Sequence, residues 1–183
     1  MLTTAAATSS QTTAPASASA AAGETVTIET RFGAIDFDRA TTLTLPHGMM
    51  GFAEFQEYGL ANLPDPRLAA FKLLQCLSEP SLSFIVVHQS PDGARVSPGD
   101  LEAAFDALGV AKADRATLYA VAVRRTGDQV EMSINLRAPI LIDTRRQLGR
   151  QYVLPNNAYA VRHRVAQPDF PTGQATGAEQ NKA

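Results

Sequence analysis

The sequence predicts a mainly β protein, a small antiparallel β-barrel-like domain with one short amphipathic helix. Three observations support this fold class. About eight to ten short apolar or alternating segments follow one another along the chain. Glycine and proline separate most of these segments, as expected for turns between strands. One segment combines helical periodicity with signals for both ends of a helix.

The 183-residue chain suits one domain flanked by two tails. Residues 1–23 contain 18 Ala, Thr or Ser residues and no charged side chain. They offer too little apolar surface to offset the entropy of ordering, so we expect a disordered tail. Residues 166–183 are polar and rich in Gly, Pro, Gln and Ala, and are expected to form a flexible tail. The domain is therefore expected to span residues 24–165.

The domain is predicted to open as an antiparallel meander. Residues 25–30 and 34–37 alternate in polarity on either side of a glycine, the pattern of a β-hairpin, and residues 41–46 repeat the alternation. The segment HGMMGFAEFQEYGL follows, in which Gly48 and Gly51 flank two methionines. The next segment, LPDPR, contains two prolines and is expected to be a loop.

The middle of the domain is predicted to hold two strands and the helix. Residues 70–78 and 82–88 are separated by a proline, and the second segment is apolar enough to lie centrally. Ser97 suits the N-cap of the helix and Pro98 its first position. The apolar residues then recur at i, i+3, i+4 and i+7, and are Leu101, Ala104, Phe105 and Leu108.

The β pattern returns after the helix. The expected strands are residues 117–124, 129–136, 138–143 and 150–154, the first two forming a hairpin. Pro139 interrupts a strongly β-forming stretch, NLRAPILID. Because proline cannot donate a hydrogen bond to a sheet, we expect Pro139 to mark a corner, where the chain leaves one strand near Leu136 and begins the next.

Charge is unevenly distributed along the domain, although the net charge of the chain is only −2. Residues 24–114 carry 13 acidic and 6 basic side chains, whereas residues 115–165 carry 3 acidic and 9 basic ones. Two explanations remain open. The asymmetry marks charged partner surfaces, or strands from the two halves interleave in space and their charges cancel.

The chain has neither the basic and apolar regions of a secretory signal nor the ~18 consecutive apolar residues of a membrane span. We therefore expect a cytoplasmic protein with no membrane partner. Its single cysteine, Cys76, cannot form an intramolecular disulfide and lies in an apolar segment, so we interpret it as a buried structural thiol.

Catalytic and metal-binding motifs are missing from the sequence. His47, His88 and His163 are far apart and have no metal-ligand spacing, and the chain contains no nucleophile elbow, P-loop or dinucleotide fingerprint. We interpret the Gly48–Gly51 segment as a tight turn that lets Phe52 and Phe55 reach the core, in preference to an anion-binding loop. We expect no enzymatic activity, no cofactor and no metal.

A nucleic-acid-binding barrel is the alternative function. Eight arginines lie in the last third of the domain, as a phosphate-binding stripe requires: Arg124, Arg125, Arg137, Arg145, Arg146, Arg150, Arg162 and Arg164. Base stacking would also require exposed aromatic residues, and only three tyrosines lie nearby. Because the whole chain is also acidic, we expect no direct contact with nucleic acid.

Several segments together resemble the flagellar assembly factor family, FliW. They are TRFGAIDFD, LPHGMMGFAEFQEYGL, FKLLQCLSEPSLSFIVV, the capped helix, SINLRAPILID and RQYVLPNNAYAVRH, in this order and spacing. The resemblance runs from about Val26 to His163. It implies a compact β-barrel-like protein without enzymatic activity, which binds flagellin and the RNA-binding translational regulator CsrA and thereby relieves repression of flagellin messenger RNA. We expect it to act as a monomer.

The resemblance leads to a hypothesis about the binding residues. CsrA needs a basic surface to hold RNA, so an acidic face on its antagonist would speed their encounter. We expect the surface around the two methionines to bind partners, through Met49, Met50, Phe52, Glu54, Glu57 and Asp65. Other motif residues are interpreted as required by the fold, namely Gly48, Gly51, Asn135, Leu136, Ala138, Pro139 and Ile140.

Three positions depart from the pattern of the resembled family. Met50 stands where proline is usual, Cys76 where serine is common, and Asp143 where asparagine is common. The first change is expected to loosen the turn and to alter the fit of one partner.

Overall fold

The computed structural model describes residues 24–88, 93, 96–127 and 129–165. The two expected tails, 1–23 and 166–183, lie outside the described residues. The strands are β1 (Thr25–Thr30), β2 (Gly33–Asp38), β3 (Leu43–Thr44), β4 (Glu57–Asn62), β5 (Phe71–Cys76), β6 (Ser83–Val87), β7 (Arg115–Thr126), β8 (Gln129–Ile134), β9 (Ile140–Asp143), β10 (Leu148–Gln151) and β11 (His163–Val165). The α-helix is α1 (Pro98–Ala107), and three short 3-10 helices are η1 (Arg39–Thr41), η2 (Pro66–Leu68) and η3 (Lys112–Asp114).

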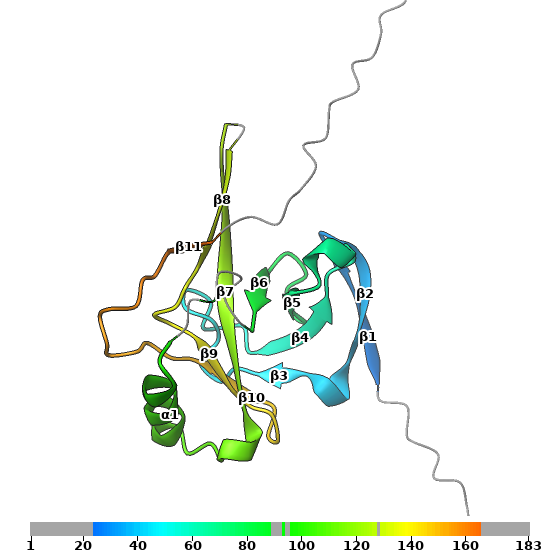
Figure 1. The fold of residues 1–183 in the computed structure, drawn as a ribbon. Coiled ribbons are helices and arrows are strands. Elements are labelled where there is room, and N and C mark those ends of the chain that lie inside the picture. Colours follow the sequence, from blue (N-terminus) through cyan, green and yellow to red (C-terminus); the bar gives the residue numbers. More distant parts are fainter. Residues whose placement is uncertain (1–23, 89–92, 94–95, 128, 166–183) are drawn as a thin grey trace, which may run out of the picture.

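The larger sheet closes into a ring. Its strands follow the order β7, β6, β5, β4, β3, β10, β9, and β9 pairs back onto the first part of β7 (Figure 1). Within the described residues these pairs are antiparallel except for β3 with β10, which is parallel. The predicted mainly β, barrel-like fold with one helix is therefore confirmed, and the parallel pair is the departure from the antiparallel prediction.

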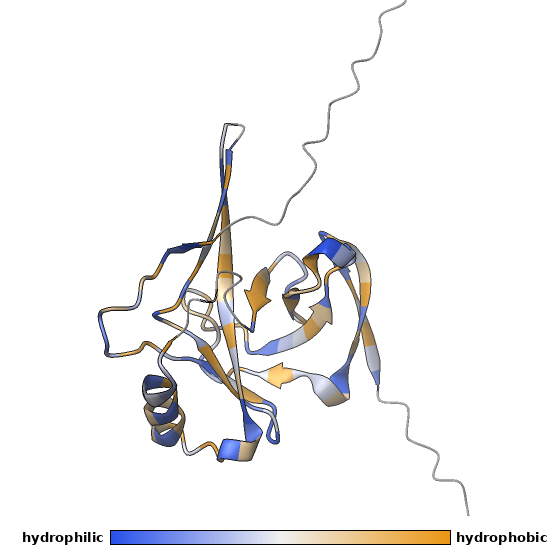
Figure 2. Ribbon diagram, in the orientation of Figure 1, coloured by the Kyte–Doolittle hydropathy of each residue, from blue (hydrophilic) through white to orange (hydrophobic). Residues whose placement is uncertain are grey.

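Two hydrophobic clusters lie on opposite faces of the ring. The inner cluster takes alternate residues from the ring strands, including Leu43, Tyr58, Leu74, Val86 and Leu118. The outer cluster takes the intervening residues, such as Leu73, Val87 and Tyr119, and is covered by residues of α1. β6 lies in the middle of the fold and is hydrophobic along its length, as its sequence predicted (Figure 2).

The helix forms where its capping signals predicted. Ser97 Oγ accepts a hydrogen bond from Asp100 N at 3.1 Å, and Pro98 occupies the first turn. Ala104 and Phe105 are buried against the outer cluster. At the other end, the Arg115 guanidinium donates to Val110 O at 2.7 Å and lies over the ring of Phe105. These contacts hold the helix on the outer face of the barrel.

Two strands were not predicted from the sequence. β4 (Glu57–Asn62) lies in the segment that ends in EYGL, and β11 (His163–Val165) is only three residues long. The predicted strand over residues 41–46 is reduced to β3. The corner at Pro139 is confirmed, because β8 ends at Ile134 and β9 begins at Ile140.

Candidate protein-binding surface

The segment between β3 and β4 is a compact loop that is hydrogen-bonded to itself. Leu45 N donates to Gln56 O at 2.7 Å, and Gly48 N donates to Leu45 O at 2.8 Å. Gly48 has a φ of +59°, and a Cβ at this position would lie 2.2 Å from Phe52 O. Glycine is therefore required at the point where the loop folds back on its own backbone.

A tight turn at the tip of this loop is anchored to a distant strand. Phe52 N donates to Met49 O at 2.8 Å, and Gly51 has a φ of +87°, as in a type II turn with Met50 at its second position. Met50 N donates to Gln151 Oε1 at 2.9 Å, and Gln151 Nε2 donates to Ala138 O at 3.3 Å. One glutamine on β10 thus joins the turn to the corner before β9.

The two methionines of the turn have opposite environments. Met49 is 2% exposed and belongs to the inner cluster, whereas Met50 is 51% exposed. Phe52 is 37% exposed, so the prediction that it reaches the core is wrong, although Phe55 does pack against the inner cluster. The Phe52 ring packs edge-on against Phe84 of β6, with their centroids 5.6 Å apart. The turn therefore presents Met50 and one face of Phe52 to solvent.

Tyr58 lies behind this aromatic pair. Its ring is fully buried and its centroid lies 6.2 Å from that of Phe84. Burial, and secondarily the nearby Cys76 thiol, raises the pKa of Tyr58 to about 12, so the phenol stays neutral at physiological pH. Cys76 is fully buried in the same cluster, as the sequence predicted.

The three acidic residues of the hypothesis have different roles. Glu54 and Glu57 are exposed, the first in the loop and the second at the start of β4. Asp65 instead caps η2 and contacts Arg67 at 2.5 Å. Hydrogen bonds from the Arg67 side chain and backbone lower the pKa of Asp65 below its ordinary value. Glu54 and Glu57 are thus the carboxylates that remain available beside the turn.

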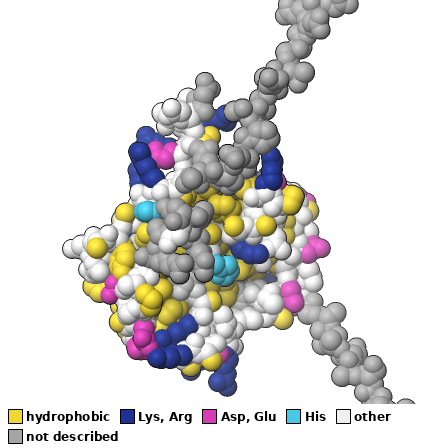
Figure 3. Space-filling model, viewed as in Figure 1, with side chains coloured by type: hydrophobic (Ala, Val, Ile, Leu, Met, Phe, Trp, Pro, Cys, Tyr) yellow, Lys and Arg dark blue, Asp and Glu magenta, His cyan; other side chains and the backbone are white. Residues whose placement is uncertain are grey.

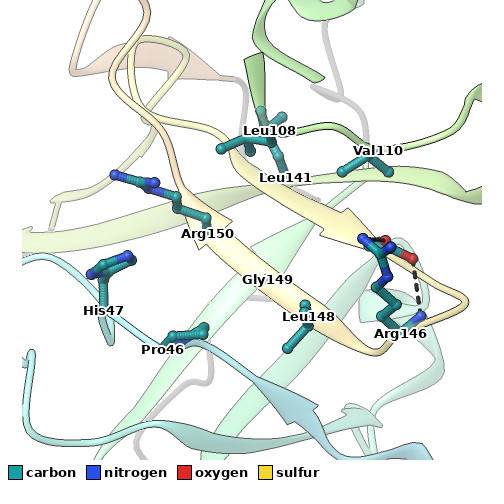
Figure 4. Close-up of a pocket in the computed structure, with 10 residues that line it drawn as sticks. Pro46, His47, Leu108, Val110, Leu141, Arg146, Leu148, Gly149 and Arg150 are labelled. Carbon is teal, nitrogen blue, oxygen red and sulfur yellow. Dashed lines mark hydrogen bonds and ion pairs between the residues drawn. The ribbon is translucent and has the colours of Figure 1, made fainter. Parts of the chain in front are cut away.

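A shallow hollow of ≈ 190 Å³ adjoins the loop (Figure 4). Its floor is apolar and includes Leu108 and Leu141, whereas His47, Arg146 and Arg150 stand around it. No pattern in the sequence indicated this hollow, because its residues come from the loop, the end of α1, β9 and β10. A local motif cannot reveal a set of residues that are brought together from four separate segments.

The corner before β9 is determined by internal hydrogen bonds. Asn135 Oδ1 accepts from Arg137 N at 3.1 Å and from Ala138 N at 3.0 Å. Tyr152 N then donates to Pro139 O at 2.8 Å, so the proline contributes its carbonyl where its missing N–H is not needed. The other motif residues of the corner, Leu136, Ala138, Pro139 and Ile140, are buried. These contacts hold the corner together, and the structural interpretation of the motif stays a prediction.

Asp143 forms a similar turn at the end of β9. Its Oδ1 accepts from Arg145 N at 3.1 Å and from Arg146 N at 2.9 Å, and its Oδ2 lies 3.6 Å from the Arg146 guanidinium. The amide bonds need only an oxygen acceptor, which aspartate and asparagine both supply. The carboxylate adds the ion pair with Arg146 on the rim of the hollow.

The acidic and basic halves of the sequence form two separate arcs of the ring. β3, β4, β5 and β6 come from the first half and β7, β9 and β10 from the second, and the two arcs meet where β3 pairs with β10 and where β6 pairs with β7. The arginines of the last third divide into separate groups. Arg145 and Arg146 lie at the β9–β10 turn and Arg150 lies on β10, whereas Arg124, Arg162 and Arg164 lie on or beside β7, β8 and β11. Arg164 is paired with Glu131 at 2.8 Å.

Within the described part of the chain, no three His, Cys, Asp or Glu side chains are grouped to hold a metal ion. None of the helices in that part is long and apolar enough to cross a membrane. The features that stand out are a closed barrel and a rigid turn with exposed apolar side chains. They define a class of small β-barrel protein that presents an anchored apolar turn at its surface.

Comparison with known proteins identifies the family. The FliW protein family profile matches residues 26–165. A flagellar assembly factor FliW from Geobacter sulfurreducens is 31% identical over 134 residues, covering 73% of this chain and 82% of that protein. One from Desulfitobacterium hafniense is 30% identical over 151 residues, covering 81% of this chain and 93% of that protein. The chain therefore belongs to the FliW family, a family of flagellar assembly factors.

A solved structure supports the fold. The crystal structure of the flagellar assembly factor FliW matches with a TM-score of 0.58 at 24% identity, covering 79% of this chain and 100% of that chain. The barrel described above is thus the architecture of the family.

Proposed function

We propose that this protein is a non-enzymatic, cytoplasmic flagellar assembly factor that binds flagellin and antagonises the translational regulator CsrA. Loss of free CsrA would relieve repression of flagellin messenger RNA translation. Membership of the FliW family supports the flagellar role, and the two partners are those that the family resemblance implies.

The anchored turn is the observation that carries the proposal. Met50 is 51% exposed on a backbone held by Gln151, and Phe52 beside it is 37% exposed. A fixed backbone lowers the entropy lost on binding, while a flexible methionine side chain adapts to partners of different shape. This combination suits a surface that must accept two unlike proteins in turn.

The two free carboxylates support the choice of CsrA as one partner. Glu54 and Glu57 are exposed beside the turn, and neither takes part in an ion pair with another described residue. An RNA-binding protein carries Lys and Arg to neutralise phosphates. We propose that Glu54 and Glu57 face that basic surface and speed the encounter by electrostatic steering.

The proposal is tested by titration calorimetry of the full chain against flagellin and against CsrA from the same cell. An unrelated single-stranded RNA serves as the control ligand. We expect saturable one-to-one binding of each protein, competition between them, and no heat with RNA. Binding of RNA alone, weakening steeply as salt is raised, would instead assign the function to the arginines of the last third.

A further inference from the structure

A second exposed apolar surface lies on the outer face of the barrel. The hairpin of β7 and β8 projects from the ring as an arm, and the tip of the β1–β2 hairpin lies across from it with β6 between them (Figure 1). A groove of ≈ 330 Å³ separates the arm from that tip. We call it the β7 groove, and its walls include Phe32, Leu68, Ile85, Val123, Val130 and Met132.

The apolar wall of the groove follows from strand alternation. Val123 pairs with Met132, and Arg125 pairs with Val130, so these four side chains share one face of the arm. The opposite face is polar and includes Glu131, whose carboxylate forms an ion pair with Arg164. Val123 is nevertheless 57% exposed and Phe32 is 36% exposed. Figure 3 shows hydrophobic side chains gathered on this side of the molecule, between the arm and the β1–β2 hairpin.

The groove also borders an open strand edge. β6 pairs with β7 only from Tyr119 to Val121, so the rest of that edge of β7 has no partner strand within the described residues. Asn135 N donates to Ala120 O, which shows that the even-numbered residues of β7 point their backbone groups toward β8. The N–H and C=O groups of Val123 and Arg125 therefore point toward the open edge.

Charge limits what can occupy this edge. Arg125 shares the groove face with Val123, and the Arg31 guanidinium lies over the Phe32 ring, 5.1 Å from its centroid, on the opposite wall. A second copy of the same edge would bring Arg125 toward another Arg125, which disfavours self-association. An acidic segment would instead meet a guanidinium on each side of the groove.

We propose that the β7 groove binds an extended, acidic segment of a partner protein as an additional β-strand. The backbone of the segment would pair with Val123 and Arg125, alternate apolar side chains would enter the groove, and acidic side chains would contact Arg125 and Arg31. The site is separate from the Met50 turn. Phe84, which packs against Phe52, and Ile85, which lines the groove, are successive residues of β6 and point to opposite faces. The inference therefore does not depend on the proposed function of the turn.

Nuclear magnetic resonance of the full chain with a capped peptide, Glu-Val-Glu-Val-Glu-Val, tests this site. We expect saturable shifts and slowed hydrogen exchange at the amides of Val123 and Arg125. The peptide Lys-Val-Lys-Val-Lys-Val should bind at least ten times more weakly. An acidic peptide methylated at alternate backbone nitrogens, which cannot pair with the edge, should also lose binding.

A pair of neighbouring substitutions controls for folding. Val123→Asp should weaken the acidic peptide at least tenfold, whereas Ala122→Asp, exposed on the polar face of the same strand, should leave its affinity unchanged. Absence of slowed exchange at Val123 and Arg125, or equal binding of the lysine peptide, would overturn the proposal. Slow exchange of these amides before any peptide is added would also overturn it. In that case the edge belongs to a second copy if the effect depends on protein concentration, and to another segment of the same chain if it does not.

Discussion

Gln151 Oε1 accepts a hydrogen bond from Met50 N at 2.9 Å, across 101 positions of sequence. This bond explains how the turn tolerates methionine at the second position of a type II turn, where proline is common. Proline would fix the backbone at this position but has no N–H to donate. In this chain the hydrogen bond to the Gln151 side chain on β10 restrains the turn in place of a proline ring.

A double-mutant cycle tests this relationship. In the Gln151→Ala background, we expect Met50→Pro to raise the free energy of unfolding by about 0.5 kcal/mol, because proline restricts the unfolded chain. In the native background the same change also removes a hydrogen bond of about 1 kcal/mol, so it should be neutral or destabilising. Urea unfolding measures both values. Gln147→Ala is the control background, and an equal effect of Met50→Pro in all three would contradict the account.

The two glycines of the turn should differ in what they tolerate. A Cβ at Gly48 would lie 2.2 Å from Phe52 O, whereas a Cβ at Gly51 would meet nothing within 4 Å. Gly51→Ala should cost about 1–2 kcal/mol, the strain of a positive φ. Gly48→Ala should cost at least about 2 kcal/mol more, because backbone atoms must move. Chemical denaturation of both variants decides the point, and equal losses would mean that the loop is looser than described.

Acid should weaken the attachment of α1 to the segment after β10. Hydrogen bonds from Tyr159 and Asn156 lower the pKa of Asp100 below its ordinary value of 3.8. A carboxyl whose folded pKa is lowered stabilises the protein fully above its ordinary pKa, and that contribution is lost as the pH falls from there through the lowered value. Tyr159→Phe should raise the pKa of Asp100 toward 3.8 and reduce the loss of stability below pH 4.

Carboxyl titration by nuclear magnetic resonance, combined with urea unfolding at neutral and acid pH, checks this expectation. Tyr152→Phe serves as the control, because Tyr152 makes no recorded contact with Asp100. An unchanged pKa of Asp100 in Tyr159→Phe would show that Tyr159 is not the main cause.

Charge reversal tests the role of the acidic side chains. We expect Glu54→Lys with Glu57→Lys to slow association with CsrA about tenfold at low salt and to lower its affinity. The effect should shrink as salt is raised, because exposed charges are screened. Glu29→Lys, an exposed change on β1, is the matched control. Stopped-flow kinetics that give the same rate for the double variant and the native chain would remove Glu54 and Glu57 from the interface.

Local patterns in the sequence predicted the elements that depend on local chemistry. Ser97 and Pro98 marked the start of α1, and Pro139 marked the corner before β9. β4 was missed because Gly59 lies inside it, and glycine is uncommon in strands. The structure gives the reason for this glycine, since a Cβ there would lie 2.2 Å from the ring of Phe37, which packs on β4. That requirement comes from β2 and cannot be seen in β4 alone.

The candidate surface was predictable only in part. The sequence drew attention to the Gly48–Gly51 segment, but it could not show which methionine faces solvent. Gln151 carried no signal, because its partners Met50 and Ala138 are distant in sequence. The edge of β7 was equally hidden, since the length of β6 pairing is set by how the two strands diverge in space.

The exposed side chain of the anchored turn, Met50, is proposed to bind the partner proteins. Titration calorimetry of Met50→Ser against flagellin and CsrA tests this proposal most directly, with Val161→Ser as a control at a site 59% exposed. Met50→Ser should weaken at least one partner tenfold or more while leaving the unfolding midpoint nearly unchanged, and Val161→Ser should bind like the native chain. Native affinity of Met50→Ser for both partners would contradict the account.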